Sequence, residues 1–156
     1  MRQSAGILLY RTSTGGPEFF LVHPGGPFWA GREEGAWTIP KGEFTEAEQP
    51  LAAARREFFE ETGHRVDGPF LPLGSVKQKA GKLVHAWAAA GDMDPAAIVS
   101  NTFRTQWPPR SGKWISVPEI DKAGWFNYGV AALLINPAQV AFLDALIAHL
   151  ENSNTK

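Results

Sequence analysis

Residues 42–64 read GEFTEAEQPLAAARREFFEETGH, and this stretch decides how the chain folds. Its second half predicts a helix over residues 50–62. Pro50 suits the first helical turn, three alanines follow, and Gly63 suits the residue that ends a helix in a left-handed conformation. This segment carries the clearest helix signals in the chain.

Three glutamates of this helix share one of its faces. Each helical residue advances about 100° around the axis, so Glu57, Glu60 and Glu61 lie within about 100° of one another. Like charges at this spacing repel, and the helix dipole disfavours them in its C-terminal half. This cost indicates a cation, and oxygen ligands without cysteine favour Mg²⁺ or Mn²⁺ over zinc. The alternative is a solvated acidic face on which Arg56 pairs with Glu60.

The whole segment resembles the Nudix box, written G-x5-E-x7-R-E-U-x-E-E-x-G-U, where U is a bulky apolar residue. The motif positions are filled at the required spacing by Gly42, Glu48, Arg56, Glu57, Phe58, Glu60, Glu61 and Gly63. The final U position departs from the motif, because His64 stands there in place of a bulky apolar residue. His64 is expected to pack rather than react. A chance match of eight typed positions is very unlikely, so the chain is identified as a MutT-like Nudix hydrolase.

The resemblance implies an α/β fold, namely the Nudix α/β/α sandwich with a mixed sheet, and a single Nudix hydrolase domain over residues 1–156. It implies metal-dependent hydrolysis of a phosphoanhydride bond in a nucleoside diphosphate linked to another group X. The implied metal ligands are the carboxylates of Glu57, Glu60 and Glu61 and the backbone carbonyl of Lys41.

Two further box residues are implied to act beside the ligands. Arg56 and Glu48 resemble the pair that orients the ligating carboxylates. Family members differ in the general base, and Glu57 or Glu60 is expected here because no later loop presents an obvious carboxylate. Glu119 and Asp121 stay open as alternatives, although N-terminal capping of a short helix is the favoured interpretation of both.

Composition narrows the remaining classes of protein. The 156 residues are 44% apolar and 20% charged, which suits one globular domain. Fifteen basic and sixteen acidic residues exclude a nucleic-acid binder acting by bulk charge. Cysteine is absent, which excludes disulfides and thiolate zinc sites. The first apolar run, residues 6–10, is too short for a signal peptide or a membrane span, so a soluble cytoplasmic protein is expected.

The near-neutral total hides two charged segments. Residues 43–61 hold six acids and two bases, whereas residues 77–113 hold six bases and two acids. The acidic segment could hold metal and the basic segment an anion.

Apolar runs and turn residues predict the elements around the box. Strands are expected over residues 4–11, 19–23, 36–39, 70–78, 82–90 and 113–117, and the two central runs should form a hairpin. Residues 91–111 are expected to be irregular. A terminal helix should start near Asn136 and bury the stripe Val140, Leu143, Leu146, Ile147 and Leu150.

Four residues are predicted to contact the substrate. Lys41 lies in a Pro-Lys-Gly sequence that resembles asymmetric dinucleoside tetraphosphate hydrolases, and it either contacts phosphate or is solvated. Lys77, in a turn with two other lysines, is expected to bind the polyphosphate tail; the alternative is an edge-strand lysine that discourages aggregation. Trp29 and Trp107 lie in Gly/Pro-rich loops and are expected to reach a cleft, where one could stack on a base.

The expected substrate is a small nucleotide, either a nucleoside triphosphate or a dinucleoside polyphosphate. The proline typical of ADP-ribose hydrolases, about 15 residues beyond the box, is missing from residues 77–82. The alternative function is a non-catalytic Nudix-fold sensor that binds a nucleotide. Such sensors usually lack some box acids, and all are present here. The oligomeric state is left open.

Overall fold

A six-stranded mixed sheet forms the centre of the molecule in the computed structural model, which describes residues 2–154. Its strands are, in spatial order, β4 (Leu71–Lys77), β5 (Leu83–Ala90), β1 (Gln3–Ser13), β2 (Gly16–Pro24) and β8 (Ile120–Phe126), while β3 (Lys41–Phe44) also pairs with β1. The β1–β5 pair is parallel and the other pairs are antiparallel, so the predicted mixed sheet is confirmed.

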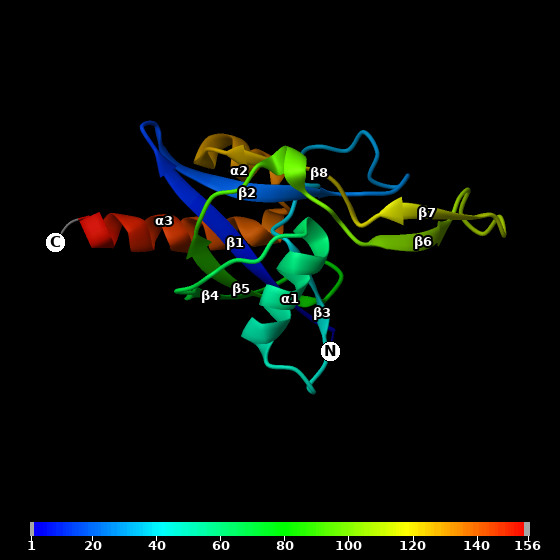
Figure 1. Cartoon of the computed structure of the whole chain (residues 1–156), viewed down its shortest axis with the longest axis horizontal. Coiled ribbons are helices and arrows are strands. Elements are labelled where there is room, and N and C mark those ends of the chain that lie inside the picture. The colour runs from blue at the N-terminus through cyan, green and yellow to red at the C-terminus, as the bar shows by residue number, and fades with distance from the viewer. Residues whose placement is uncertain (1, 155–156) are drawn as a thin grey trace.

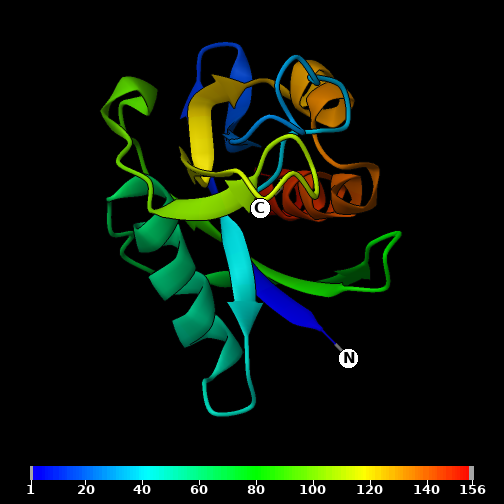
Figure 2. The same ribbon diagram turned by 90° about the vertical axis from the view of Figure 1, so that its right-hand side faces the viewer.

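Strand β1 is buried on both faces, which explains its continuous apolar run. Ile7 and Leu9 face the helix α1 (Pro50–Thr62), whereas Leu8 faces α2 (Tyr128–Leu134) and α3 (Val140–Asn154). Figure 2 shows α1 and α3 on opposite sides of the sheet. The predicted α/β/α arrangement follows from this alternation, because successive side chains of a strand point to opposite faces.

Helix α1 has the predicted bounds. Pro50 stands in its first turn, and Gly63 takes a φ of 78° and donates its N–H to the Phe59 carbonyl at 2.7 Å. Ala53, Ala54 and Phe58 are buried against the sheet, which leaves the glutamates to face β3 and its surroundings.

The terminal helix is also confirmed. Asn136 accepts a hydrogen bond from the Ala138 N–H and opens a 3₁₀ turn, Pro137–Gln139, that leads into α3. Leu143 and Leu146 of the predicted stripe are buried in the core. No helix within residues 2–154 is long and apolar enough to cross a membrane.

The structure corrects the prediction for residues 91–111. They are not wholly irregular, because they contain the 3₁₀ turn Pro95–Ala97 and the strand β6 (Thr102–Gln106), which pairs with β7 (Trp114–Pro118) in a separate two-stranded sheet. Figure 1 shows this hairpin projecting away from the main sheet. No residue of β6 is fully buried, so the strand shows no run of apolar residues.

Four other segments differ from expectation. Residues 36–39 form only isolated bridges, from Thr38 to Val22 and from Trp37 to Ile135, rather than a strand. Strands β3 and β8 and helix α2 were not predicted, because their short sequences carry glycine or charged residues and little periodicity. The strand β8 matters most, since it begins directly beside the site described below.

At Gly6 strand β1 closely approaches the start of β3. A Cβ there would lie 2.5 Å from the Pro40 carbonyl oxygen and 2.7 Å from the Lys41 Cβ. We expect Gly6→Ala to lower the free energy of unfolding by about 1–3 kcal/mol, because backbone must shift to admit the methyl group. Gly15→Ala is the matched control, since nothing lies within 4 Å of its Cβ position. Urea denaturation of both variants measures the difference, and equal stabilities would contradict the close packing.

Candidate active site

The acidic face of α1 is largely withdrawn from solvent. Glu57 and Glu61 are only 8% and 9% exposed, and the side chain of Glu60 is 33% exposed. Burial raises the pKa of Glu57, opposed by its hydrogen bond from Arg56. Burial also raises the pKa of Glu61, and repulsion from Glu57 adds to it. Glu57 and Glu61 therefore lie where ionisation is unfavourable unless a cation is close by.

Gly42 makes room for the first of these carboxylates. A Cβ on Gly42 would stand 2.0 Å from the carboxyl carbon of Glu57, so only glycine permits the contact. The next residue towards the N-terminus, Lys41, donates its backbone N–H to Glu61 Oε1 at 3.1 Å. The start of β3 thus holds two glutamates of α1.

Arg56 holds the acidic face together from the other side. Its Nε and Nη2 each donate to a different oxygen of Glu48 at 2.8 Å, a bidentate pair. Its Nη1 donates to Glu57 at 2.8 Å and to Glu60 at 3.0 Å. This geometry orients both carboxylates, and Glu48 fixes the guanidinium that does so.

A fourth carboxylate comes from beyond the box. Glu119 lies between β7 and β8, so the expectation that it caps a helix is wrong. Its backbone N–H donates to the Asn101 carbonyl at 2.8 Å, and the Asn101 N–H donates to the carbonyl of Glu60 at 2.9 Å. Burial raises the pKa of Glu119, and repulsion from Glu60 adds to it. Its carboxylate has no hydrogen-bond or ion-pair partner among residues 2–154.

A cavity of about 320 Å³ opens beside these groups, within the usual size range of ligand pockets. Its charged lining consists of Lys41, Glu61, Lys82 and Glu119, and Trp29 lies on its wall. Burial, together with the nearby Lys82, lowers the pKa of Lys41. Two cationic and two anionic side chains therefore share one pocket.

Two of the predicted substrate contacts do not line this cavity. Lys77 is exposed on β4, while Lys82, across the turn, is the hairpin lysine that faces the cavity and pairs with Glu43 at 3.5 Å. Trp107 is 43% exposed near the tip of the β6–β7 hairpin. Strand alternation alone did not reveal which lysine points inward, since the turn after β4 reverses the chain.

An amide pair closes the back of the cavity. Gln139 is fully buried and accepts the Ile39 N–H at 3.1 Å, while its side-chain nitrogen donates to Gln78 at 2.9 Å. Thr38 Oγ1 also contacts Gln139. Both glutamines line the cavity, and their buried hydrogen bonds fix its shape.

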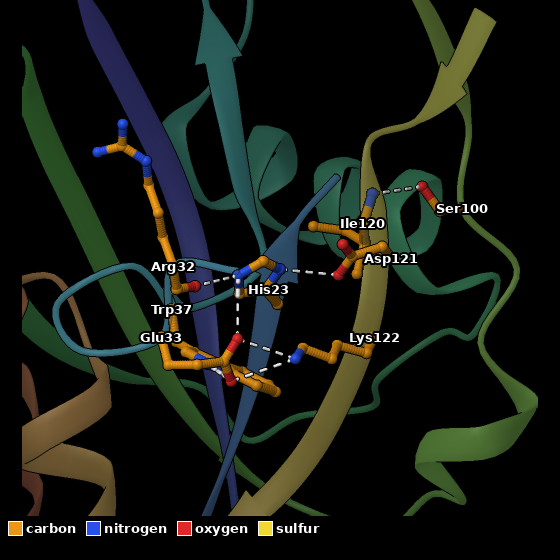
Figure 3. A network of polar contacts seen from close by, with 8 residues as sticks. All are labelled: His23, Arg32, Glu33, Trp37, Ser100, Ile120, Asp121 and Lys122. Atoms are coloured by element: carbon orange, nitrogen blue, oxygen red, sulfur yellow. Dashed lines mark hydrogen bonds and ion pairs between the residues drawn. The ribbon is translucent and has the colours of Figure 1, made fainter. Parts of the chain in front are cut away.

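A buried histidine anchors the loop that carries Trp29 (Figure 3). His23 is 1% exposed, and its Nδ1 lies 2.8 Å from Asp121 Oδ1 while its Nε2 lies 2.6 Å from the Arg32 carbonyl. Glu33, beside Arg32, accepts two hydrogen bonds from Lys122 at 3.1 and 2.9 Å. The loop between β2 and β3 is thereby tied to β2 and β8, and Asp121 is a loop anchor rather than a helix cap.

The donor set fits a hard divalent cation. The carboxylates of Glu57, Glu60 and Glu61 and the backbone of Lys41 offer only oxygen ligands, which suit Mg²⁺ or Mn²⁺. Within residues 2–154, however, no three acidic or histidine side chains converge as a ready-made metal site. Arg56 instead occupies the space between Glu57 and Glu60.

Comparisons with known proteins agree with this architecture. The profile of the NUDIX domain matches residues 1–146. A search of curated proteins finds no match.

Similar folds occur among solved structures. A C. elegans Ap4A hydrolase binary complex has a TM-score of 0.69 at 21% identity, covering 97% of this chain and 99% of that one. The NUDIX domain of Shewanella oneidensis NrtR, complexed with ADP ribose, has a TM-score of 0.65 at 13% identity, covering 95% and 87%. A mutT/nudix family protein from Listeria innocua has a TM-score of 0.63 at 18% identity, covering 99% and 96%. At these identities the likeness establishes the fold.

The anchor at His23 can be tested by stability. We expect His23→Phe to lower the free energy of unfolding by about 1–3 kcal/mol, because the Arg32 carbonyl and Asp121 lose their partner. His149→Phe is the matched control on the exposed face of α3. Chemical denaturation measures both, and a stable His23→Phe protein would contradict the anchoring role.

Proposed function

The chain belongs to the NUDIX family of hydrolases, and on that premise we propose that it cleaves a phosphoanhydride bond in a nucleoside polyphosphate with the help of a divalent metal. The proposed substrate is a nucleoside triphosphate or a dinucleoside polyphosphate. The observation that carries the proposal is the apposition of carboxylates and lysines. Glu61 and Glu119 line the same cavity as Lys41 and Lys82, an arrangement suited to metal and phosphate together.

The metal would be held by Glu57, Glu60, Glu61 and the carbonyl of Lys41. When bound, Mg²⁺ or Mn²⁺ supplies positive charge that offsets the charge of the phosphate oxygens. The chain itself prepares the ligands. Arg56 orients Glu57 and Glu60, and the Lys41 N–H orients Glu61.

Hydrolysis requires one proton transfer to the protein. The oxygen of a water molecule forms a bond to phosphorus, the bridging P–O bond breaks, and the leaving phosphate keeps that bond's electron pair. The proton lost by the water passes to a carboxylate. A general base works best when its pKa lies near the working pH, and burial raises the pKa of Glu119.

We assign the general base to Glu119 in preference to Glu57 or Glu60. Arg56 donates to Glu57 and to Glu60, so an oxygen of each of these carboxylates is already engaged in a hydrogen bond. Glu119 has no such donor among residues 2–154 and lines the cavity. Glu57 and Glu60, the bases expected from the sequence, are left to hold the metal.

The cavity also suggests how the nucleotide is held. Lys41 and Lys82 are placed to neutralise phosphate oxygens, a role in which Lys82 takes the place expected of Lys77. Trp29 offers an aromatic wall for a base, and Gln78 and Asn136 offer amide groups to its edge. An Ap4A hydrolase and an ADP ribose complex among the similar folds are consistent with a nucleotide ligand.

The metal ligands are tested by amide substitution. We expect Glu57→Gln and Glu60→Gln to reduce kcat at least about 100-fold, because charge neutralisation by a metal contributes several kcal/mol to the transition state. Mg²⁺ should raise the Tm of the wild-type protein and have little effect on either variant. Glu46→Gln, an exposed box residue outside the motif positions, should behave as wild type.

Wild-type rates in Glu57→Gln and Glu60→Gln would show that the metal assignment is wrong. Tight nucleotide binding by the wild-type chain, with no phosphate or nucleotide product, would instead favour a Nudix-fold sensor. Product analysis over nucleoside triphosphates, dinucleoside polyphosphates and ADP-ribose distinguishes these outcomes.

The base has its own test. We expect Glu119→Gln to lower kcat about 100-fold or more while KM changes little, since general-base catalysis contributes about 10²–10⁴-fold. Mg²⁺ should still raise the Tm of this variant, unlike that of Glu57→Gln. Full activity of the Glu119→Gln enzyme would indicate that the general base is one of the box glutamates instead. Steady-state kinetics with Glu34→Gln as an exposed control measures the effect.

A further inference from the structure

The hairpin formed by β6 and β7 is unusual because it pairs with no other strand in the described part of the chain. A lone two-stranded hairpin is marginally stable in water, and such elements usually pack against something. Most of this hairpin is nevertheless exposed, including Phe103 at 39%, Trp114 at 53% and Ile115 at 37%. Figure 1 shows it extending beyond the body of the fold.

The charge of this segment has one sign. Residues 95–118 contain Arg104, Arg110 and Lys113 and no Asp or Glu. An exposed element with aromatic rings and only positive charge is complementary to an aromatic anion. A nucleotide has this chemistry.

The register gives the hairpin two different faces. Phe103 lies opposite Val117, and a Cβ added at Gly26, in the loop that follows β2, would lie 3.5 Å from each of these side chains. Arg104 belongs to the other face, where its guanidinium stands 5.1 Å from the centre of the Trp114 ring. One face thus fixes the hairpin to the molecule, and the other presents a paired ring and cation to solvent.

The hairpin is joined directly to the proposed active site. Pro118 ends β7, Glu119 follows, and the Glu119 carbonyl accepts the Gly25 N–H at 2.8 Å. Trp114 precedes Glu119 by five residues, which corresponds to about 16 Å along a strand. A second aromatic group, Trp29, lines the cavity itself.

We infer that Trp114 and Arg104 form a platform for the distal nucleoside of a dinucleoside polyphosphate, whose other nucleoside occupies the Trp29 cavity. The polyphosphate would then cross the carboxylates and lysines between the two aromatic sites. This inference rests on the proposed function and names its substrate class. The platform binds the far end of the substrate and leaves the hydrolytic step at the site unchanged.

A single nucleoside fits the observations better than a nucleic-acid strand. Within strands β6 and β7, the face that carries Arg104 has one aromatic ring, that of Trp114, whereas strand-binding grooves carry successive rings along a basic track. The chain's net charge of −1 also lacks the basic footprint of such proteins.

The test is steady-state hydrolysis of diadenosine tetraphosphate and of ATP by the full chain with Mg²⁺. We expect Trp114→Ala to raise KM for the dinucleotide about tenfold and to change KM for ATP by less than about twofold, because base stacking on the ring is lost. Arg104→Gln should act in the same direction, and Trp114→Phe should retain most of the affinity. Ile115→Ala, on the opposite face of the same strand, is the matched control.

Equal effects of Trp114→Ala on both nucleotides, or no effect on either, would overturn the platform. The platform would also be overturned if Trp114→Ala lowered the affinity for a 5′-triphosphate RNA oligonucleotide and left the affinity for the dinucleotide unchanged. Titration calorimetry with the two nucleotides measures their binding affinities without relying on turnover. A wild-type chain that hydrolyses neither nucleotide would refute the proposed function, while a selective loss of dinucleotide affinity in Trp114→Ala would still support the platform.

Discussion

The desolvation of negative charge on one face of α1 is the constraint on which the site depends. Glu57 and Glu61 are buried although like charges repel and a carboxylate prefers water. Neighbouring groups offset the unfavourable burial of these carboxylates in different ways. Arg56 donates a hydrogen bond to Glu57, and the Lys41 N–H donates one to Glu61. Gly42 has no side chain, which leaves room for the Glu57 carboxylate. A divalent cation would complete the compensation, which links metal binding to the stability of this face.

The sheet supports this arrangement by holding the chain from both sides. Strand β1 packs α1 against one face and α3 against the other, and β3 pairs with β1 at the point where Lys41 meets Gly6. The position of β3 therefore depends on the central strand, and the position of the carboxylates depends on β3. A rigid scaffold of this kind allows buried charges to be placed within hydrogen-bonding distance.

Cations and aromatic rings come from segments far apart in the chain. Lys82 follows a turn, Trp29 lies on a loop anchored through His23, and Glu119 stands between two strands. The anchoring of His23 by Asp121 and by the Arg32 carbonyl joins the loop to β8. Glu119 lies two residues before Asp121. The loop that carries Trp29 and the proposed base are therefore held by neighbouring residues where β7 leads into β8.

The amino-acid sequence by itself determined the family motif, the bounds of α1, the β4–β5 hairpin and the terminal helix. Each rests on local spacing: a helix period of 3.6 residues, a strand period of two, and residues that start or stop helices. Only the tertiary structure decided that Lys82 rather than Lys77 lines the cavity, that Glu119 joins the box glutamates, and that residues 102–118 form a projecting hairpin. These features depend on which segments meet in space. The energy of such contacts comes from desolvation and pairing between residues up to 101 positions apart, as for Thr38 and Gln139, and no local pattern encodes it.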